Sequence, residues 1–174
     1  MSKLYLMMRS SADLGKSTWI KKQLKNTDAY VSRDEIRFNL LKDNEDYFKY
    51  ESEVFNIFCN RINEALNNPN IYKVFADATH LNAKSRIKVL DKLNIKPNEI
   101  NVIWLKTPLD VCLKRNKQRI GRANVPEDTI KNMYYNLEEP SNKENIDYLY
   151  IVDYKSKTIK SMWLKEFDFD GFIF

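Results

Sequence analysis

The feature that most constrains the fold is an apolar segment that runs through a short polar loop into Gly15-Lys16-Ser17-Thr18. The segment from Lys3 to Arg9 contains Leu-Tyr-Leu-Met-Met, which is apolar enough for a strand buried on both faces of a sheet. The residues from about Lys16 to Lys25 predict a helix. A buried strand, a tight turn and a helix in this order indicate an α/β fold with a parallel sheet.

The rest of the chain alternates between apolar runs of strand length and segments with helical spacing. Further strands are predicted at 29–32, 71–76, 99–105 and 148–152, and a hairpin through 158–164 is compatible with the pattern. Helices are predicted at about 34–41 (with Asp34 as N-cap), 46–67, 83–93, 108–118 and 126–138. We therefore expect a five-stranded, mainly parallel sheet with helices on both faces. Residues 1–153 form one domain in this prediction, and residues 154–174 form a C-terminal extension that packs on it.

Composition limits the class of protein. A length of 174 residues suits one hydrophobic core, and the N-terminus lacks the pattern of a signal peptide. No apolar run approaches the roughly 18 residues of a membrane-spanning helix. Cys59 and Cys112 belong to no C-x-x-C pair, which favours reduced, buried thiols and, with one histidine, argues against a zinc site. We expect a cytoplasmic protein without a membrane contact, and its net charge of +5 permits a nucleotide or nucleic-acid partner.

Residues 10–17 match most of the pattern G-x-x-x-x-G-K-[ST], which binds phosphates between a strand and a helix. Backbone N–H groups and the helix N-terminus bind the phosphates, and Gly15 lets the backbone approach them closely. Lys16 is expected to reach the β- and γ-phosphates, Ser17 to bind Mg²⁺ and Thr18 to contact the α-phosphate. The motif therefore predicts a P-loop that uses ATP and Mg²⁺. Its predicted nucleotide contacts are Asp13, Leu14, Gly15, Lys16, Ser17 and Thr18.

Two residues of this loop depart from the pattern. Ser10 stands where the first glycine is usual, and Asp13 places a carboxylate in the loop. A carboxylate that points inward repels phosphate, whereas one that points to solvent costs little. A weakened nucleotide site, or a binding module without catalytic activity, is therefore an alternative.

Asp34 is the candidate for the carboxylate that orients an acceptor hydroxyl and takes its proton. It follows the predicted second strand, at the edge where ligands bind in open α/β sheets. Arg37 lies one helical turn further on and can hold an acceptor phosphate at two points. The alternative is that Asp34 only caps its helix and pairs with Arg37.

Two further features follow later strands. Asp77 ends the third strand and resembles a Walker B aspartate, which holds Mg²⁺ through water or orients Ser17. His80 lies three residues later, and we expect it to be a solvent-exposed loop residue rather than a catalytic one. Arg115 and Arg119 have the spacing of one helical face and predict a basic lid that neutralises charge on the moving phosphoryl group. A solvated basic surface is the alternative reading of these arginines.

Taken in order, five stretches resemble the kinase domain of phage-type polynucleotide 5′-hydroxyl kinases, within the P-loop kinases that include zeta-type toxins. The stretches are Gly15-Lys16-Ser17-Thr18-Trp19, Ser32-Arg33-Asp34-Glu35-Ile36-Arg37, Asp77-Ala78-Thr79-His80-Leu81-Asn82, Lys114-Arg115-Asn116-Lys117-Gln118-Arg119 and Val125-Pro126-Glu127. They span roughly residues 3–153 in the order that the family has them.

The resemblance implies a role for each matching residue. Asp34 matches the general base, Arg37 the contact to the acceptor's 3′-phosphate, and Arg119 the lid contact to the γ-phosphate. Lys16 and Ser17 match the residues for phosphate and Mg²⁺. Further expected contacts are Arg33, Asp77 and Thr79 for the acceptor, Arg115 and Arg122 in the lid, and Asp77 for the metal.

Three hypotheses about function follow. The first is ATP-dependent phosphorylation of a 5′-hydroxyl end of DNA or RNA, as in end repair. The second is a related kinase of a small hydroxyl acceptor, such as a nucleoside, a sugar nucleotide or an antibiotic. The third is a non-catalytic nucleotide-binding module. The sequence leaves open which nucleic acid is used and whether the protein forms oligomers.

Overall fold

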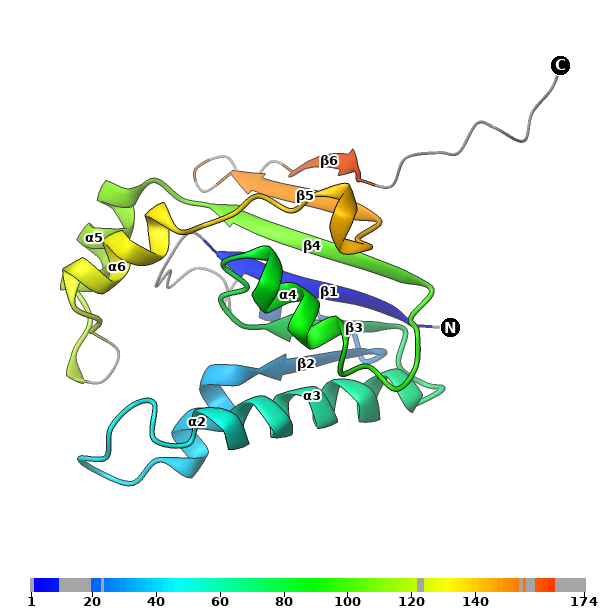
Figure 1. The fold of residues 1–174 in the computed structure, drawn as a ribbon, viewed down its shortest axis with the longest axis horizontal. Helices are drawn as coiled ribbons and strands as arrows, with labels where there is room; N and C mark the ends of the chain where they lie inside the picture. Colours follow the sequence, from blue (N-terminus) through cyan, green and yellow to red (C-terminus); the bar gives the residue numbers. More distant parts are fainter. Residues whose placement is uncertain are drawn as a thin grey trace, which may run out of the picture.

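The computed structural model describes residues 2–9, 20–22, 24–121, 124–153, 155 and 159–164. Within these residues, six strands form one sheet in the order β2-β3-β1-β4-β5-β6 (Figure 1). The strands are β1 (Lys3–Arg9), β2 (Asp28–Ser32), β3 (Lys73–Asp77), β4 (Glu99–Lys106), β5 (Tyr148–Asp153) and β6 (Ile159–Trp163). All neighbouring pairs are parallel except β5 and β6. The predicted mainly parallel α/β fold is confirmed, but the predicted sheet is one strand short, because β6 turns back and pairs with the edge of β5.

The helices are close to their predicted places. They are α2 (Arg33–Leu40), α3 (Glu51–Asn67), α4 (Ala83–Leu90), α5 (Leu109–Lys117), α6 (Glu127–Tyr135) and the 3₁₀ helix η2 (Asn142–Glu144). Of the helix predicted from Lys16 to Lys25, Ile20 and Lys21 are described as helical. None of the helices in the described residues is long and apolar enough to cross a membrane.

Two helix starts differ from the prediction. Ser32 is the N-cap of α2, because its hydroxyl accepts a hydrogen bond from the backbone N–H of Glu35 at 3.2 Å. This places Asp34 inside the first turn, where its side chain can serve another purpose. The third helix starts at Glu51 rather than near Asp46, whose carboxylate accepts a hydrogen bond from the N–H of Phe48 and holds a turn instead.

The core lies on both faces of the sheet. On one face, side chains of β1 such as Leu4 and Leu6 pack with the apolar side of α3, including Phe58 and Ile62. Figure 1 shows α3 and α4 on this same face. On the other face, Met7, Ile103 and Val152 form a second cluster with Ile20. Burial on both faces explains why these strands read as continuous apolar runs.

Candidate active site

The carboxyl ends of β1, β2 and β3 meet at one edge of the sheet. Asp77 pairs in register with Met7 on one side and with Ser32 on the other. Its side chain is buried, and one carboxylate oxygen accepts a hydrogen bond from the Tyr30 hydroxyl at 2.5 Å. Asp77 therefore lies beside the strand that leads into the predicted phosphate loop. That loop and its predicted contacts from Asp13 to Thr18 lie outside the described residues.

Asp34 lies in the first turn of α2, at the same edge of the sheet. Its Oδ1 accepts hydrogen bonds from Arg37 at 2.6 Å and from the Tyr47 hydroxyl at 3.0 Å. These two contacts fix the direction of the carboxylate, while 38% of the side chain remains exposed. An oriented but accessible carboxylate is what a base for an acceptor hydroxyl requires.

Arg37 is buried between two carboxylates and an aromatic ring. One terminal nitrogen donates to Asp34, and the other donates to Glu51 at 2.7 Å. The guanidinium also lies 4.4 Å from the centre of the Tyr47 ring, within the range of a cation–π contact. Glu51 forms a second ion pair with Arg33. The first residue of α3 thus connects the two arginines on either side of Asp34.

The electrostatics of this cluster keep Arg37 charged. Burial alone lowers the pKa of its guanidinium. The hydrogen bond to Glu51 and the negative charges of Glu51 and Asp34, with a further electrostatic contribution from Tyr47, outweigh burial and raise the pKa above its usual value. Asp34 is therefore always next to a positive charge. Among the described residues, the Nε atoms of Arg33 and Arg37 are buried and have no hydrogen-bond partner.

Arg86 stabilises the loop after β3 through hydrogen bonds to its backbone. This fully buried arginine donates to the backbone oxygens of His80 and Glu138, both at 3.0 Å, and pairs with Glu144. His80 itself is 2% exposed and has a positive φ of 47°. The prediction of a solvent-exposed His80 is therefore wrong. Thr79, a predicted acceptor contact, is half-buried beside it.

The predicted basic lid consists of α5, α6 and the segment between them. Figure 1 shows both helices beyond the carboxyl ends of the strands, at the same end of the sheet as α2. Arg115 is in α5, but this helix ends at Lys117, so Arg119 lies beyond its C-cap. The expectation that Arg115 and Arg119 share one helical face is wrong for this reason. Arg122 lies outside the described residues.

Asn116 holds the segment that carries Arg119. It is buried, and its amide donates to the Asn124 side chain at 3.0 Å and to the Val125 oxygen at 2.7 Å. Its carbonyl oxygen accepts from the Val125 N–H at 3.0 Å. Cys112 and Ile130 form a small apolar cluster between α5 and α6, separate from the main core. The lid is therefore a unit with its own interior.

Sequence reasoning missed several residues that build this site. These are Tyr47, Glu51, Arg86, Asn116 and Glu144. Each acts through a contact to a residue outside its own local pattern, such as Glu51 with Arg37, 14 positions earlier. Helical or strand periodicity does not report such contacts. The available signal was that Arg86 and Asn116 stand where helical spacing from Val89 and Cys112 predicts an apolar side chain.

Comparison with known proteins assigns the chain to a family. A family model described as an AAA domain (AAA_33) matches residues 12–140. The L-seryl-tRNA(Sec) kinase of Methanococcus maripaludis is 31% identical over an alignment of 147 residues, and the match covers 80% of this chain and 54% of that protein. The chain thus spans about half the length of this curated relative.

Solved structures with the same fold include a chain of an RNA repair complex and a gluconokinase. A chain of the Pnkp1/Rnl/Hen1 RNA repair complex has a TM-score of 0.64 and 18% identity, covering 96% of this chain and 50% of that one. A gluconokinase from Sinorhizobium meliloti 1021 has a TM-score of 0.55 and 16% identity, covering 89% of this chain and 83% of that one. At this level of identity the likeness shows a shared fold.

Proposed function

Since the chain belongs to the AAA domain family and has the α/β fold of P-loop kinases, we propose that it is a kinase. In this proposal it transfers the γ-phosphate of ATP to a 5′-hydroxyl end of DNA or RNA. In this proposal residues 1–153 are the kinase domain. Residues 154–174 are an extension that packs on it, to which β6 belongs.

The observation that carries the proposal is the setting of Asp34. Its carboxylate is aimed by Arg37 and Tyr47, remains accessible, and lies at the edge of the sheet where β1 leads into Gly15-Lys16-Ser17-Thr18. A kinase needs an oriented carboxylate beside a phosphate-binding loop. A carboxylate that only capped its helix would bind the backbone N–H groups, and here Ser32 fills that role.

The reaction uses these residues as follows. Asp34 accepts the proton of the acceptor hydroxyl, whose oxygen attacks the γ-phosphorus. The bond from this phosphorus to the bridging oxygen breaks, and ADP leaves with that electron pair. Arg37 holds Asp34 in place and keeps positive charge beside it. Arg115, Arg119 and Arg122 are the candidates that neutralise charge on the transferred group.

Asp77 and Ser17 fit a magnesium ion that is bound mainly by the phosphates of the nucleotide. Asp77 lies at the carboxyl edge of β3, next to β1, and Ser17 follows in the predicted loop. The described residues contain no group of three or more acidic, histidine or cysteine side chains that could hold a metal on their own. Mg²⁺ usually keeps several waters and binds one or two protein ligands together with phosphates. When bound, it would neutralise the charge of the β- and γ-phosphates.

A small-molecule acceptor is the second candidate. The chain is similar to a gluconokinase and to an L-seryl-tRNA(Sec) kinase. Both names indicate acceptor hydroxyl groups other than a 5′ end. The non-catalytic module remains the third candidate, on the grounds of Ser10 and Asp13.

The decisive experiment is phosphate transfer from γ-labelled ATP with Mg²⁺. The acceptors are 5′-hydroxyl oligonucleotides of DNA and RNA, with gluconate and seryl-tRNA as alternatives. Asp34→Asn should abolish transfer, whereas Glu35→Gln, which neutralises the next carboxylate on the same turn, should retain it. Label on gluconate alone would replace the proposal by the second candidate, and label on seryl-tRNA alone would refute a 5′-hydroxyl end as the acceptor. Absence of ATP binding would support the third.

A further inference from the structure

Three aromatic rings form a continuous row beside Asp34. Phe38 and Tyr47 meet edge to face with ring centres 6.1 Å apart, and Tyr47 and Phe48 meet edge to face at 4.9 Å. Phe38 is 43% exposed and Phe48 is 61% exposed. We name these three residues the aromatic row. Large apolar side chains that gather at the surface usually mark a binding site.

The aromatic row lies next to the candidate catalytic carboxylate, and one hydrogen bond joins the two. The Tyr47 hydroxyl in its centre donates to Asp34 at 3.0 Å. Phe38 lies four residues after Asp34 on α2, so both side chains emerge on the same helix face. A molecule that presents a hydroxyl to Asp34 therefore places its adjoining part over these rings.

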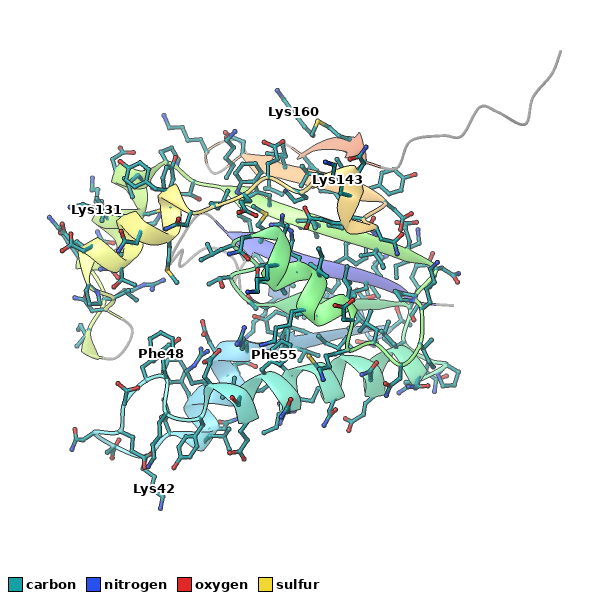
Figure 2. The ribbon with its side chains drawn as sticks, viewed as in Figure 1. Lys42, Phe48, Phe55, Lys131, Lys143 and Lys160 are labelled. Carbon is teal, nitrogen blue, oxygen red and sulfur yellow. The ribbon has the colours of Figure 1, made fainter. Side chains whose placement is uncertain are left out.

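The loop that carries Phe48 has a fixed backbone. The backbone N–H of Phe48 donates to the Asp46 side chain at 2.8 Å, and the backbone oxygen of Phe48 accepts from the N–H of Glu51 at 3.1 Å. The N–H of Lys42 donates to Glu45 at 3.0 Å, which closes the other end of the loop. Figure 2 shows Phe48 projecting from this loop on the side that faces α5 and α6. The exposed ring is thus held in position before any ligand binds.

We propose that the aromatic row is a stacking platform for the nucleobase next to the phosphorylated hydroxyl, so that the acceptor is a base-bearing 5′ end. This rests on the kinase function proposed above and names the chemistry of its acceptor. Flat aromatic surfaces bind nucleobases by stacking without regard to sequence. Edge-to-face packing within the row leaves the face of the terminal ring, Phe48, available for this contact.

The test measures transfer to two oligonucleotides that differ only in the 5′-terminal base, which one of them lacks. Phe48→Ala should raise the KM for the base-bearing oligonucleotide about tenfold and should hardly affect the abasic one. Phe48→Trp should restore the low KM because it restores a ring. Tyr72→Ala is the matched control: Tyr72 is also an exposed aromatic, but it precedes β3 at the opposite end of the sheet.

The outcomes separate the two proposals. If the wild-type protein phosphorylates oligonucleotides and Phe48→Ala changes the KM of both substrates equally or not at all, the platform is refuted and the kinase function stands. If the wild-type protein phosphorylates no oligonucleotide, both proposals fail. If Phe48→Ala instead converts a dimer to a monomer in sedimentation, the aromatic row is an interface between copies of the chain, which also refutes the platform.

Discussion

Arg86 and Glu144, 58 residues apart in the chain, form a fully buried two-point ion pair that joins α4 to η2. The Nε and one terminal nitrogen of Arg86 bind the two carboxylate oxygens at 2.6 and 2.9 Å. Because the remaining terminal nitrogen binds the backbone of His80 and Glu138, one side chain fixes both the loop after β3 and the chain that returns from the lid.

Removing one partner of this pair should destabilise the protein strongly. Glu144→Ala leaves the Arg86 charge buried without its carboxylate, and we expect a loss of about 3–5 kcal/mol in the free energy of unfolding. Urea denaturation measures it. Lys117→Ala, which breaks the exposed ion pair with Glu127, is the control and should change the midpoint little. An unchanged midpoint for Glu144→Ala would show that the pair does not hold the fold.

Glu51 should matter for catalysis because it positions two arginines beside Asp34. Glu51→Ala removes a carboxylate from both Arg33 and Arg37, which frees Arg37 to turn away from Asp34. We expect kcat/KM for phosphate transfer to fall roughly tenfold, the value of one hydrogen bond to a charged group. Glu53→Ala, an exposed acid in the same first turn of α3, should behave as wild type. Equal activity of the two variants would argue against a positioning role for Glu51.

The central strands β1, β3 and β4 were predictable because they are buried on both faces and therefore read as apolar runs. The start of α3 was not, because Asp46 uses its side chain to stabilise a turn that continues the helical spacing of the sequence. The same competition between side chain and backbone explains α2, where Ser32 and Asp34 are both good capping residues and only the structure shows which one caps.

The candidate site was predictable only in its local parts. Asp34 and Arg37 lie three residues apart on one helix, and their pairing was foreseen as an alternative to a catalytic role. Glu51 and Tyr47 reach them from outside the helix, and no spacing rule connects such residues. His80 was predicted to be a solvated loop residue. Its burial depends on Arg86 and on the packing of the loop, which the local sequence pattern does not show.

Tyr5 should make the protein less stable at high pH. Burial is the main cause that raises the pKa of this tyrosine to about 12, and Tyr150 adds to it. The folded state therefore keeps the phenol proton that the unfolded chain begins to lose near its ordinary pKa of 10.0. The resulting stabilisation of the unfolded state lowers the free energy of unfolding as the pH rises from about 10 to about 12. Tyr5→Phe should show a smaller decrease.

Absorbance at 295 nm provides an independent measurement of the same effect. Titration of the folded protein should contain a late phenolate step that is smaller in Tyr5→Phe, in which Tyr150, whose pKa burial also raises, still contributes to it. In guanidinium chloride the step should disappear from the wild-type titration as well, because unfolding ends the burial. A late step of unchanged size in Tyr5→Phe would assign it to another tyrosine.

Asn116 should control how well the lid presents Arg119. Asn116→Ala removes three hydrogen bonds to Asn124 and Val125, so the segment after α5 opens more often, while the distant core is unaffected. Trypsin cleaves after arginine, and cleavage after Arg119 should become faster than in wild type. The kcat of phosphate transfer should fall with it, because a mobile arginine spends less time at the phosphate. Gln118→Ala changes an exposed neighbour and is the matched control. If Asn116→Ala and Gln118→Ala are cleaved at the same rate, the hydrogen bonds of Asn116 do not order the lid.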